Sequence, residues 1–349
     1  MMNISILYKF RKGPWGGTNQ FLQALRKEFL KMEVYEENME RADAILFNSY
    51  PVGSEYLFEK ILRLKEQYPS KIVIYRLDGP ISLYRGKDRV VDKIIGLFNE
   101  LLADGIIFQS NWSRKQNRRY FGISSKYETV IHNASDNEIF NKKGKKEFNP
   151  SRKIKLIATS WSSNWRKGFE TYKYLDENLD SSKYEMTFIG NSPIEFRNMR
   201  WTKPVCSEKV AEILKEHDVY ISASENDPCS NSLIESFCCG LPAVALNDGG
   251  HPELVGKGGE LFNGKEDVIG KIESIVRNYL YYQQKIPTFS IKKVSQAYYN
   301  FVKEIYHDVQ DGTYQPKVVS LSTKVGFYRM NWLILKRAIL DKIKAVMKL

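Results

Sequence analysis

Short apolar runs alternate with longer amphipathic segments along the first half of the chain. The apolar runs have the length of β-strands, and the segments between them have the three-and-four spacing of helices. The predicted strands are Ile4–Tyr8, Ala44–Phe47, Ile72–Tyr75, Gly105–Phe108 and Thr129–His132. The predicted helices are Gly17–Phe29, Ser54–Gln67, Val90–Leu102 and Ser113–Phe121. This alternation predicts parallel β-α-β units with helices on both faces of a sheet.

The alternation restarts after residues 141–153, a polar, basic stretch broken by Gly and Pro that is typical of an interdomain linker. The next predicted strands are Lys155–Thr159, Glu185–Ile189, Val219–Ser222, Ala243–Leu246 and Gly259–Phe262. Helices are predicted near Phe169–Glu177, Ser207–Lys215, Ser230–Cys239, Asp267–Tyr282 and Ile291–His307. We therefore predict two Rossmann-like α/β domains, 1–145 and 152–288, that face each other across a cleft, with helix 289–310 packing back on the first.

Residues 316–349 are predicted to form a basic amphipathic tail helix. Apolar positions recur at a spacing of three and four, at Trp332, Leu335, Ile339, Ile343 and Val346. The residues opposite them are Arg337, Asp341, Lys344 and Lys348. Such a helix either packs on the protein or a partner subunit, or lies on an anionic membrane face.

The densest chemical pattern lies in residues 219–256, where a strand runs into a polar loop and then a helix. The helix is predicted to begin at Ser230, Asn231 and Ser232, and its unpaired N–H groups and positive dipole end suit a diphosphate. Asp227 and Glu235 stand eight residues apart around this turn, and their carboxylates can accept hydrogen bonds from ligand hydroxyls.

The acidic residue, the Glu eight positions later, and the following C-G-L-P-A-V and G-G-x-P-E sequences resemble the donor-binding half of group 1 (family 4) glycosyltransferases. The resemblance extends to about residue 310 and implies the GT-B fold. It implies that Glu235 binds the ribose of a nucleotide-sugar and that Asp227 lies beside the sugar as a catalytic residue. Most members have Glu in place of Asp227, so the nearby Glu225 is an alternative for that role.

A second segment, SWSSNWRKGFE at 160–170, is similar to the family's phosphate-binding loop. The resemblance implies that Lys167 reaches the donor diphosphate and assists catalysis by neutralising the leaving group. Many members carry Arg six residues earlier, where this chain has Trp161. Arg166 is expected to supply the second charge at the donor.

Gly16 and Gly17, in the sequence GPWGGTNQF, resemble the family's N-terminal glycine loop, where backbone passes close to donor phosphates. Arg76 and Asp78 follow a first-domain strand, at a segment where members often have a His. This chain has no His there. Arg76 and Asp78 either line the acceptor site, with Asp78 as a further catalytic candidate, or simply pair with each other.

No metal or other cofactor is expected. The four Cys residues include no C-x-x-C pair, the four His residues are scattered, and Asp-x-Asp is absent. The glycine patterns of dinucleotide enzymes and P-loop ATPases are absent as well. Reduced thiols and the missing signal-peptide layout favour a cytoplasmic protein.

The chain has 349 residues and a formal net charge of +12, which is unevenly distributed. The net charge is +7 for residues 1–150, −2 for 151–315 and +7 for 316–349. A helix face with Arg114, Lys115, Arg118 and Arg119 suggests nucleic acid by charge alone, but no nucleic-acid motif accompanies it. Because the excess lies outside the donor half, it points to peripheral attachment at the inner face of the cytoplasmic membrane.

The family resemblance implies a retaining, hexosyltransferase-like glycosyltransferase, and the absence of a metal-ligand motif fits a metal-independent one. It would move a sugar from a nucleotide-sugar to a glycan or lipid-linked acceptor in bacterial-type surface polysaccharide or glycoconjugate synthesis. The alternative is a nucleotide-binding scaffold protein on the same fold that has lost catalysis, since the missing His, the missing Arg and the Asp-for-Glu change all depart from the family pattern.

Overall fold

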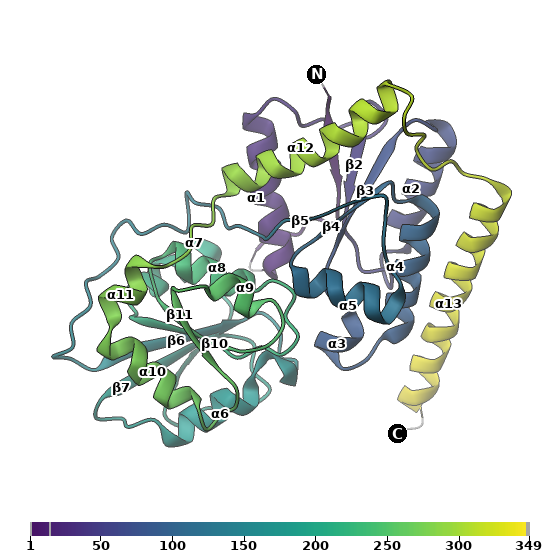
Figure 1. Cartoon of the computed structure of the whole chain (residues 1–349). Coiled ribbons are helices and arrows are strands. Elements are labelled where there is room, and N and C mark those ends of the chain that lie inside the picture. The colour runs from purple at the N-terminus through teal and green to yellow at the C-terminus, as the bar shows by residue number, and fades with distance from the viewer. Residues whose placement is uncertain (1, 14, 347–349) are drawn as a thin grey trace. The chain divides into compact units, whose positions relative to one another are not determined.

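The computed structural model describes residues 2–13 and 15–346, which form two compact units. The first unit contains the residues up to Lys9, Arg26–Ile131 and the chain from Ser295 onward, and the second contains Phe10–Leu25 and His132–Val294. Each unit is built on one parallel sheet covered by helices (Figure 1). The predicted α/β class with two parallel-sheet domains is therefore confirmed.

The first sheet has the strand order β1-β2-β3-β4-β5. Its strands are β1 (Ile4–Leu7), β2 (Ala44–Phe47), β3 (Ile72–Leu77), β4 (Gly105–Phe108) and β5 (Tyr127–Val130). The helices that follow them are α1 (Gly17–Lys31), α2 (Glu55–Gln67), α3 (Ile81–Arg85), α4 (Arg89–Leu102) and α5 (Asn111–Phe121). The first four strands are buried along their whole length, which explains why they read as unbroken apolar runs.

The core of the first unit is an aromatic cluster between the sheet and its helices. Phe47 of β2 makes edge-to-face contacts with Phe58 of α2 and Phe98 of α4, at centroid distances of 4.9 and 5.1 Å. Helix α12 (Ile291–Gln310) also reaches this unit, since Ile305 packs against Gly105 of β4. A Cβ at Gly105 would lie only 2.8 Å from Ile305 Cδ1, so the sheet and helix depend on a glycine there.

Helix α13 (Leu321–Val346) packs along the first unit beside α4 (Figure 1). Its buried stripe is Phe327, Met330 and Ile334, which join the core of that unit. The predicted apolar stripe is a different one: Trp332, Leu335, Ile339 and Ile343 are exposed. The side chains of Asp341, Lys344 and Val346, and residue Lys348, lie outside the described part of the chain. The tail thus packs on the protein with one apolar face and presents a second apolar face to solvent.

The second sheet has the strand order β11-β10-β9-β6-β7-β8. Its strands are β6 (Ile154–Ser160), β7 (Tyr184–Gly190), β8 (Arg200–Thr202), β9 (Val219–Ser222), β10 (Ala243–Leu246) and β11 (Gly259–Phe262). Its helices are η1 (Trp165–Lys167), α6 (Phe169–Asn178), α7 (Ser207–Lys215), α8 (Asn231–Cys238), α9 (His251–Val255), α10 (Val268–Arg277) and α11 (Tyr279–Gln284). One core, with α6 and α10, covers one face, and another, with α7, α8 and α9, covers the other.

The order of the second sheet reverses at β6, which pairs with β7 on one side and β9 on the other. The loops after β6 and β9 therefore leave the sheet in opposite directions. In open α/β sheets, ligands bind outside the carboxyl ends of the strands at such a switch point. The two loops that carry Lys167 and Asp227 are the loops that flank it.

Candidate functional site

Lys167 and Asp227 form an ion pair at the switch point of the second sheet. Lys167 ends η1, after β6, and its Nζ lies 2.9 Å from Oδ2 of Asp227 in the loop after β9. Gly168 makes this approach possible, because its φ is +93° and a Cβ there would meet Ala223 at 2.4 Å. The K-G sequence therefore places the lysine against the β9 loop, and the structure brings together two residues that stand sixty positions apart.

Asp227 is nearly buried and is held as a carboxylate by several partners. Burial would raise its pKa, but the charge of Lys167 and hydrogen bonds from Lys167 and Ser224 outweigh that effect and hold the pKa below its ordinary value. The Ser224 hydroxyl donates to Oδ2 at 3.1 Å, and the Cys229 N–H donates to Oδ1 at 3.2 Å. A charged carboxylate in a fixed position follows from these contacts.

His251 lies fully buried behind Asp227. Burial lowers the pKa of His251, so the neutral ring is favoured. Its Nδ1 lies 3.0 Å from the Leu246 carbonyl, which can only accept, so Nδ1 carries the proton and Nε2 accepts from the Ser222 hydroxyl at 3.0 Å. The His251 ring and the Ser222 hydroxyl are thus joined by a hydrogen bond, and both groups are neutral.

The predicted helix start is confirmed at α8. Ser230 is the N-cap, and its Oγ accepts from the Leu233 N–H at 3.4 Å. The N–H groups of Asn231 and Ser232 lie in the first turn, where a helix offers them no intrahelical acceptor. The Asn231 side chain is fixed by Asn133, whose Nδ2 donates to Asn231 Oδ1 at 3.1 Å. The helix end supplies oriented donors suited to an anion.

Glu235 lies one turn inside α8 and is a partly buried carboxyl group with no hydrogen-bond partner among the described residues. Burial alone raises its pKa to about 8. Its side chain is only partly buried, so its oxygens remain accessible to a ligand or to water. Glu235, the helix end and the Lys167–Asp227 pair together make this edge of the sheet the candidate ligand site.

Gly16 and Gly17 pack closely within the second unit, and Gly17 packs on the same helix start. A Cβ at Gly17 would lie 2.4 Å from Asn231 Nδ2, and one at Gly16 would lie 3.0 Å from Trp161 Cδ1. Gly17 is therefore required for close packing against Asn231, and a side chain at position 16 would force Trp161 to shift. This contact also explains why residues 10–25 belong to the second unit.

Arg166 pairs with Glu225, and both side chains are exposed. The guanidinium lies 3.5 Å from the Glu225 carboxylate, and the Glu225 N–H donates to the Arg166 carbonyl at 2.8 Å. Glu225, the alternative to Asp227, thus has a cationic partner other than Lys167. Asp227, and not Glu225, contacts the lysine of the K-G sequence.

In the first unit, Arg76 and Asp78 do pair with each other. Arg76 is fully buried at the end of β3, and its Nη1 donates to Asp78 Oδ1 at 3.2 Å. Gln109, after β4, donates to the same carboxylate oxygen. Ser113 Oγ and Asn117 Nδ2 of α5 donate to the Asp78 carbonyl at 3.0 and 2.9 Å. Asp78 is therefore a fixed, partly exposed carboxylate at the carboxyl edge of the first sheet.

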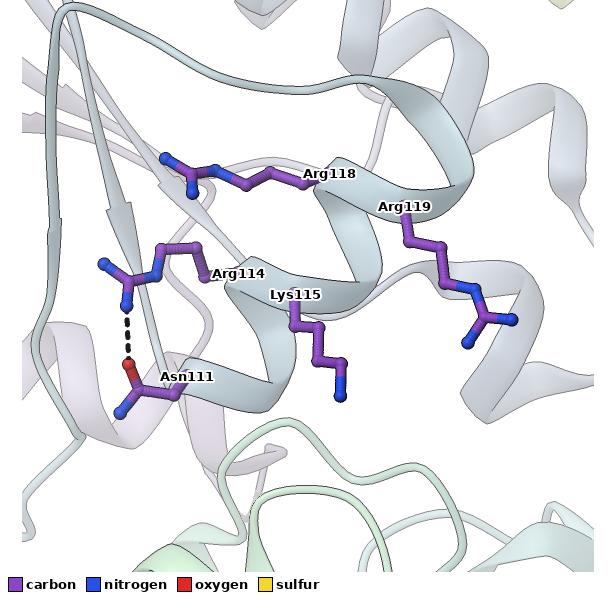
Figure 2. A pocket seen from close by; sticks show the side chains of 5 residues that line it. All are labelled: Asn111, Arg114, Lys115, Arg118 and Arg119. Atoms are coloured by element: carbon purple, nitrogen blue, oxygen red, sulfur yellow. Dashed lines mark hydrogen bonds between the residues drawn. The ribbon is translucent and has the colours of Figure 1, made fainter.

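The opposite side of α5 carries the predicted basic face. Arg114, Lys115, Arg118 and Arg119, with Asn111, line a shallow hollow of ≈ 610 Å³ (Figure 2). The side chains of Arg114 and Arg118 extend to one side of the helix, and those of Lys115 and Arg119 to the other (Figure 2). Arg118 pairs with Glu128, and Arg114 donates to Asn111 at 2.9 Å.

Within residues 2–13 and 15–346, no three His, Cys, Asp or Glu side chains gather in a way that could hold a metal ion. No helix in the same part of the chain is long and apolar enough to cross a bilayer.

Sequence reasoning missed the support that surrounds Asp227. His251 directly follows Gly249 and Gly250, and Gly249 (φ +63°) passes so close that a Cβ would lie 2.4 Å from the Asp227 carbonyl. The G-G-H-P-E sequence was the available signal, because two glycines before a helix imply close backbone contact. Ser222 and Ser224 gave no signal, since serines at a strand end are common.

Comparisons with known proteins agree with this architecture. Residues 174–278 match the family model described as glycosyl transferases group 1. Sucrose-phosphate synthase from Thermosynechococcus elongatus superimposes with a TM-score of 0.65 at 12% identity, covering 88% of this chain and 100% of its own. No curated protein sequence matches the chain.

Two further solved structures are similar. HepE of Anabaena, in complex with UDP-glucose, gives a TM-score of 0.62 at 12% identity, with 89% of this chain and 100% of that chain covered. TarM of S. aureus gives 0.58 at 14% identity, with 79% and 57% covered. The GT-B fold and the resemblance to group 1 glycosyltransferases are thereby confirmed, and the matched segment supports assignment as a glycosyltransferase.

Proposed function

We propose that this chain is a retaining glycosyltransferase that moves a sugar from a nucleotide-sugar to a glycan or lipid-linked acceptor, in the synthesis of a surface polysaccharide or glycoconjugate. The observation that carries the proposal is Glu235, a partly buried carboxyl without a protein partner, one turn inside the helix that begins just after Asp227, the partner of Lys167. Ribose hydroxyls would satisfy this carboxyl, and a diphosphate would take the N–H groups of the helix start.

The class of donor follows from what similar proteins bind. HepE has been solved with UDP-glucose, and TarM with UDP and an α-GlcNAc-glycerol ligand. A UDP-sugar is therefore the first donor to test on this chain. The fold similarity supports the class of donor but does not select among sugars.

Catalysis would rest on electrostatic stabilisation of the leaving nucleoside diphosphate. Lys167 and the first N–H groups of α8 are oriented before the donor arrives, so no reorganisation is needed as negative charge develops. Asp227 is held beside Lys167, and the group 1 resemblance assigns it a place beside the transferred sugar. No metal is invoked, because these groups offer positive charge themselves. Retention of configuration is inferred from the group 1 resemblance.

On the acceptor side, Asp78 is the group proposed to contact the incoming hydroxyl. Arg76 and Gln109 both donate to its Oδ1, which leaves Oδ2 as the oxygen for a ligand. Arg76 is fully buried, so we assign it a positioning role through Asp78 and not direct contact.

We also propose that α13 attaches the enzyme to an anionic membrane face, where a lipid-linked acceptor would be met. The exposed apolar stripe follows the three-and-four spacing of one helix face: Leu321, Val325, Tyr328, Trp332, Leu335, Ile339 and Ile343. Arg329 and Lys336 are exposed at its border. An apolar stripe bordered by cations, with an interfacial Trp, is the pattern of helices that lie in the headgroup region.

The test is turnover of UDP-glucose and related nucleotide-sugars on glycan and lipid-linked acceptors, with the product's anomeric configuration read by NMR. The proposal expects release of the nucleoside diphosphate and a product with the donor's configuration. An inverted product would contradict the retaining mechanism. Tight nucleotide binding without turnover on any acceptor would instead support the scaffold alternative.

A further inference from the structure

The guanidinium of Arg11 stacks on the ring of Trp15, and its central carbon lies 3.9 Å from the ring centroid. The Trp15 ring in turn contacts Trp161 at a tilt of 43°, with 5.2 Å between the ring centroids. Trp161 directly follows β6, at the switch point of the second sheet. All three side chains are exposed, although an indole of this size would ordinarily be largely buried.

The stack is held in place by the backbone around it. The Arg11 N–H donates to Asn19 Oδ1 at 2.9 Å, and Asn19 Nδ2 donates back to the Arg11 carbonyl at 3.0 Å. Asn19 is buried, which fixes the start of the loop. At its other end the loop is fixed by Gly16 and Gly17, which pack against Trp161 and against Asn231 of α8. The Arg11 backbone is thus fixed by Asn19, two residues after the glycine that packs on Asn231 of α8.

The charged side chains of the candidate donor site differ in whether they already have a carboxylate partner. Lys167 is paired with Asp227, and Arg166 is paired with Glu225, so each of these two cations already faces a carboxylate. No carboxylate of the described residues lies within ion-pair distance of Arg11. A nucleoside diphosphate is a strong anion, and its stable binding in a site with such balanced charge calls for an additional, unpaired cation.

We propose that Arg11 supplies this cation: its guanidinium binds the donor diphosphate while it stacks on the ring of Trp15, which Trp161 contacts from its own loop. This inference rests on the proposed function, since it assigns a ligand group at the same site. Guanidinium suits the role because it can bind phosphate through two N–H groups and stack on an aromatic face at the same time. Trp161 then acts through Trp15, because it contacts the ring on which Arg11 is stacked.

The experiment is isothermal titration of UDP, GDP, ADP and dTDP into the full-length protein, followed by the monophosphate and nucleoside of the tightest binder. The variants are Arg11→Gln, Arg11→Lys and Trp15→Leu. Arg277→Gln serves as the matched control, because Arg277 is exposed in the last turn of α10. Thermal unfolding of each variant checks that the fold is retained.

We expect Arg11→Gln to weaken the diphosphate about ten- to a hundred-fold, as for loss of a charged hydrogen bond, and to leave the nucleoside within about two-fold. Arg11→Lys and Trp15→Leu should give intermediate losses, and Arg277→Gln none. Equal diphosphate affinity in wild type and Arg11→Gln would overturn the inference while the proposed function stands. A parallel loss of nucleoside affinity would also overturn it, since Arg11 would then act only through the loop's structure. Failure of every diphosphate to bind wild type would contradict the proposed function itself, and this inference with it.

Discussion

Nζ of Lys167 lies 2.9 Å from Oδ2 of Asp227, and this pair joins the loops that follow the two central strands of the second sheet. Lys167 compensates the charge of the buried Asp227 carboxylate, which would be costly without a partner. The pair also keeps a positive charge close to the loop that leads into α8. A diphosphate bound there would meet Lys167 on one side and helix N–H groups on the other. The leaving group would be stabilised by charges already in place.

Lys167→Ala is therefore expected to reduce turnover much more than it alters the fold. Removal of one preorganised charge at a developing anion costs about 10²–10³ in kcat. Steady-state kinetics with a nucleotide-sugar would measure it. Lys173→Ala is the matched control, since Lys173 is an exposed lysine on α6 that pairs with Glu177, one turn further along the helix. Similar kcat values for the two variants would contradict the assigned role of Lys167.

Glu235→Gln is expected to change how stability depends on pH. Burial raises the pKa of Glu235 to about 8, above its ordinary value of 4.5. The folded protein then holds this proton more tightly than the unfolded chain does. The contribution of the protonated Glu235 carboxyl to the free energy of unfolding is complete below pH 4.5, and it is lost as pH rises through 8. Gln cannot ionise, so the Tm of Glu235→Gln minus that of wild type should increase by several degrees between pH 4.5 and 8.

Thermal unfolding of both proteins at several pH values tests this directly. Glu195→Gln is a suitable control, because Glu195 is exposed. A Tm difference that stays constant with pH would mean that Glu235 ionises normally, and the account of an unsatisfied carboxyl would fail.

The pattern of apolar runs predicted the sheets well, because β2, β3, β4 and the central strands of the second sheet are buried on both faces. It did not predict β8, a three-residue edge strand whose side chains are largely exposed, nor the short helices α3 and α9. Such elements are fixed by tertiary contacts and have too few residues to show a period.

The site was predictable where backbone geometry dictates residue type, as at Gly17 and Gly168. The contacts that join Arg11, Trp15 and Trp161 could not be predicted, because no local sequence pattern relates residues 150 positions apart. The tail shows a further limit. Helix α13 has two apolar stripes, and its sequence alone does not say which one is buried: Phe327, Met330 and Ile334 face α4, and the stripe that includes Trp332 does not.

Asp78→Ala is expected to impair use of the acceptor and to leave binding of the nucleotide unchanged. Nucleoside diphosphate affinity should stay within about two-fold of wild type, while kcat/KM for the acceptor falls about ten- to a hundred-fold through loss of a charged hydrogen-bond partner. Bisubstrate kinetics combined with nucleotide titration would show this. Asp180→Ala, at an exposed loop carboxylate, is the control. Loss of nucleotide affinity in Asp78→Ala would place Asp78 on the donor side instead.

Leu335→Glu is expected to abolish binding to vesicles that contain anionic lipid, without lowering Tm. Leu335 is 59% exposed on α13, so the change removes no core contact but puts a charge into the membrane-facing stripe. Leu280→Glu, at a leucine that is 64% exposed in the second unit, should co-sediment like wild type. Deletion of residues 316–349 is a poorer test, because it also removes Phe327 and Met330 from the core. Undiminished vesicle binding by Leu335→Glu would exclude the stripe as the anchor.

The most direct test of the central claim, that the α8 edge of the second sheet binds a nucleotide-sugar, is calorimetric titration of UDP and UDP-glucose into wild type and Glu235→Ala. The account predicts saturable one-to-one binding to wild type and at least a ten-fold weaker Kd in the variant, because the ribose hydroxyls lose their acceptor. Equal affinity in the two proteins would contradict it.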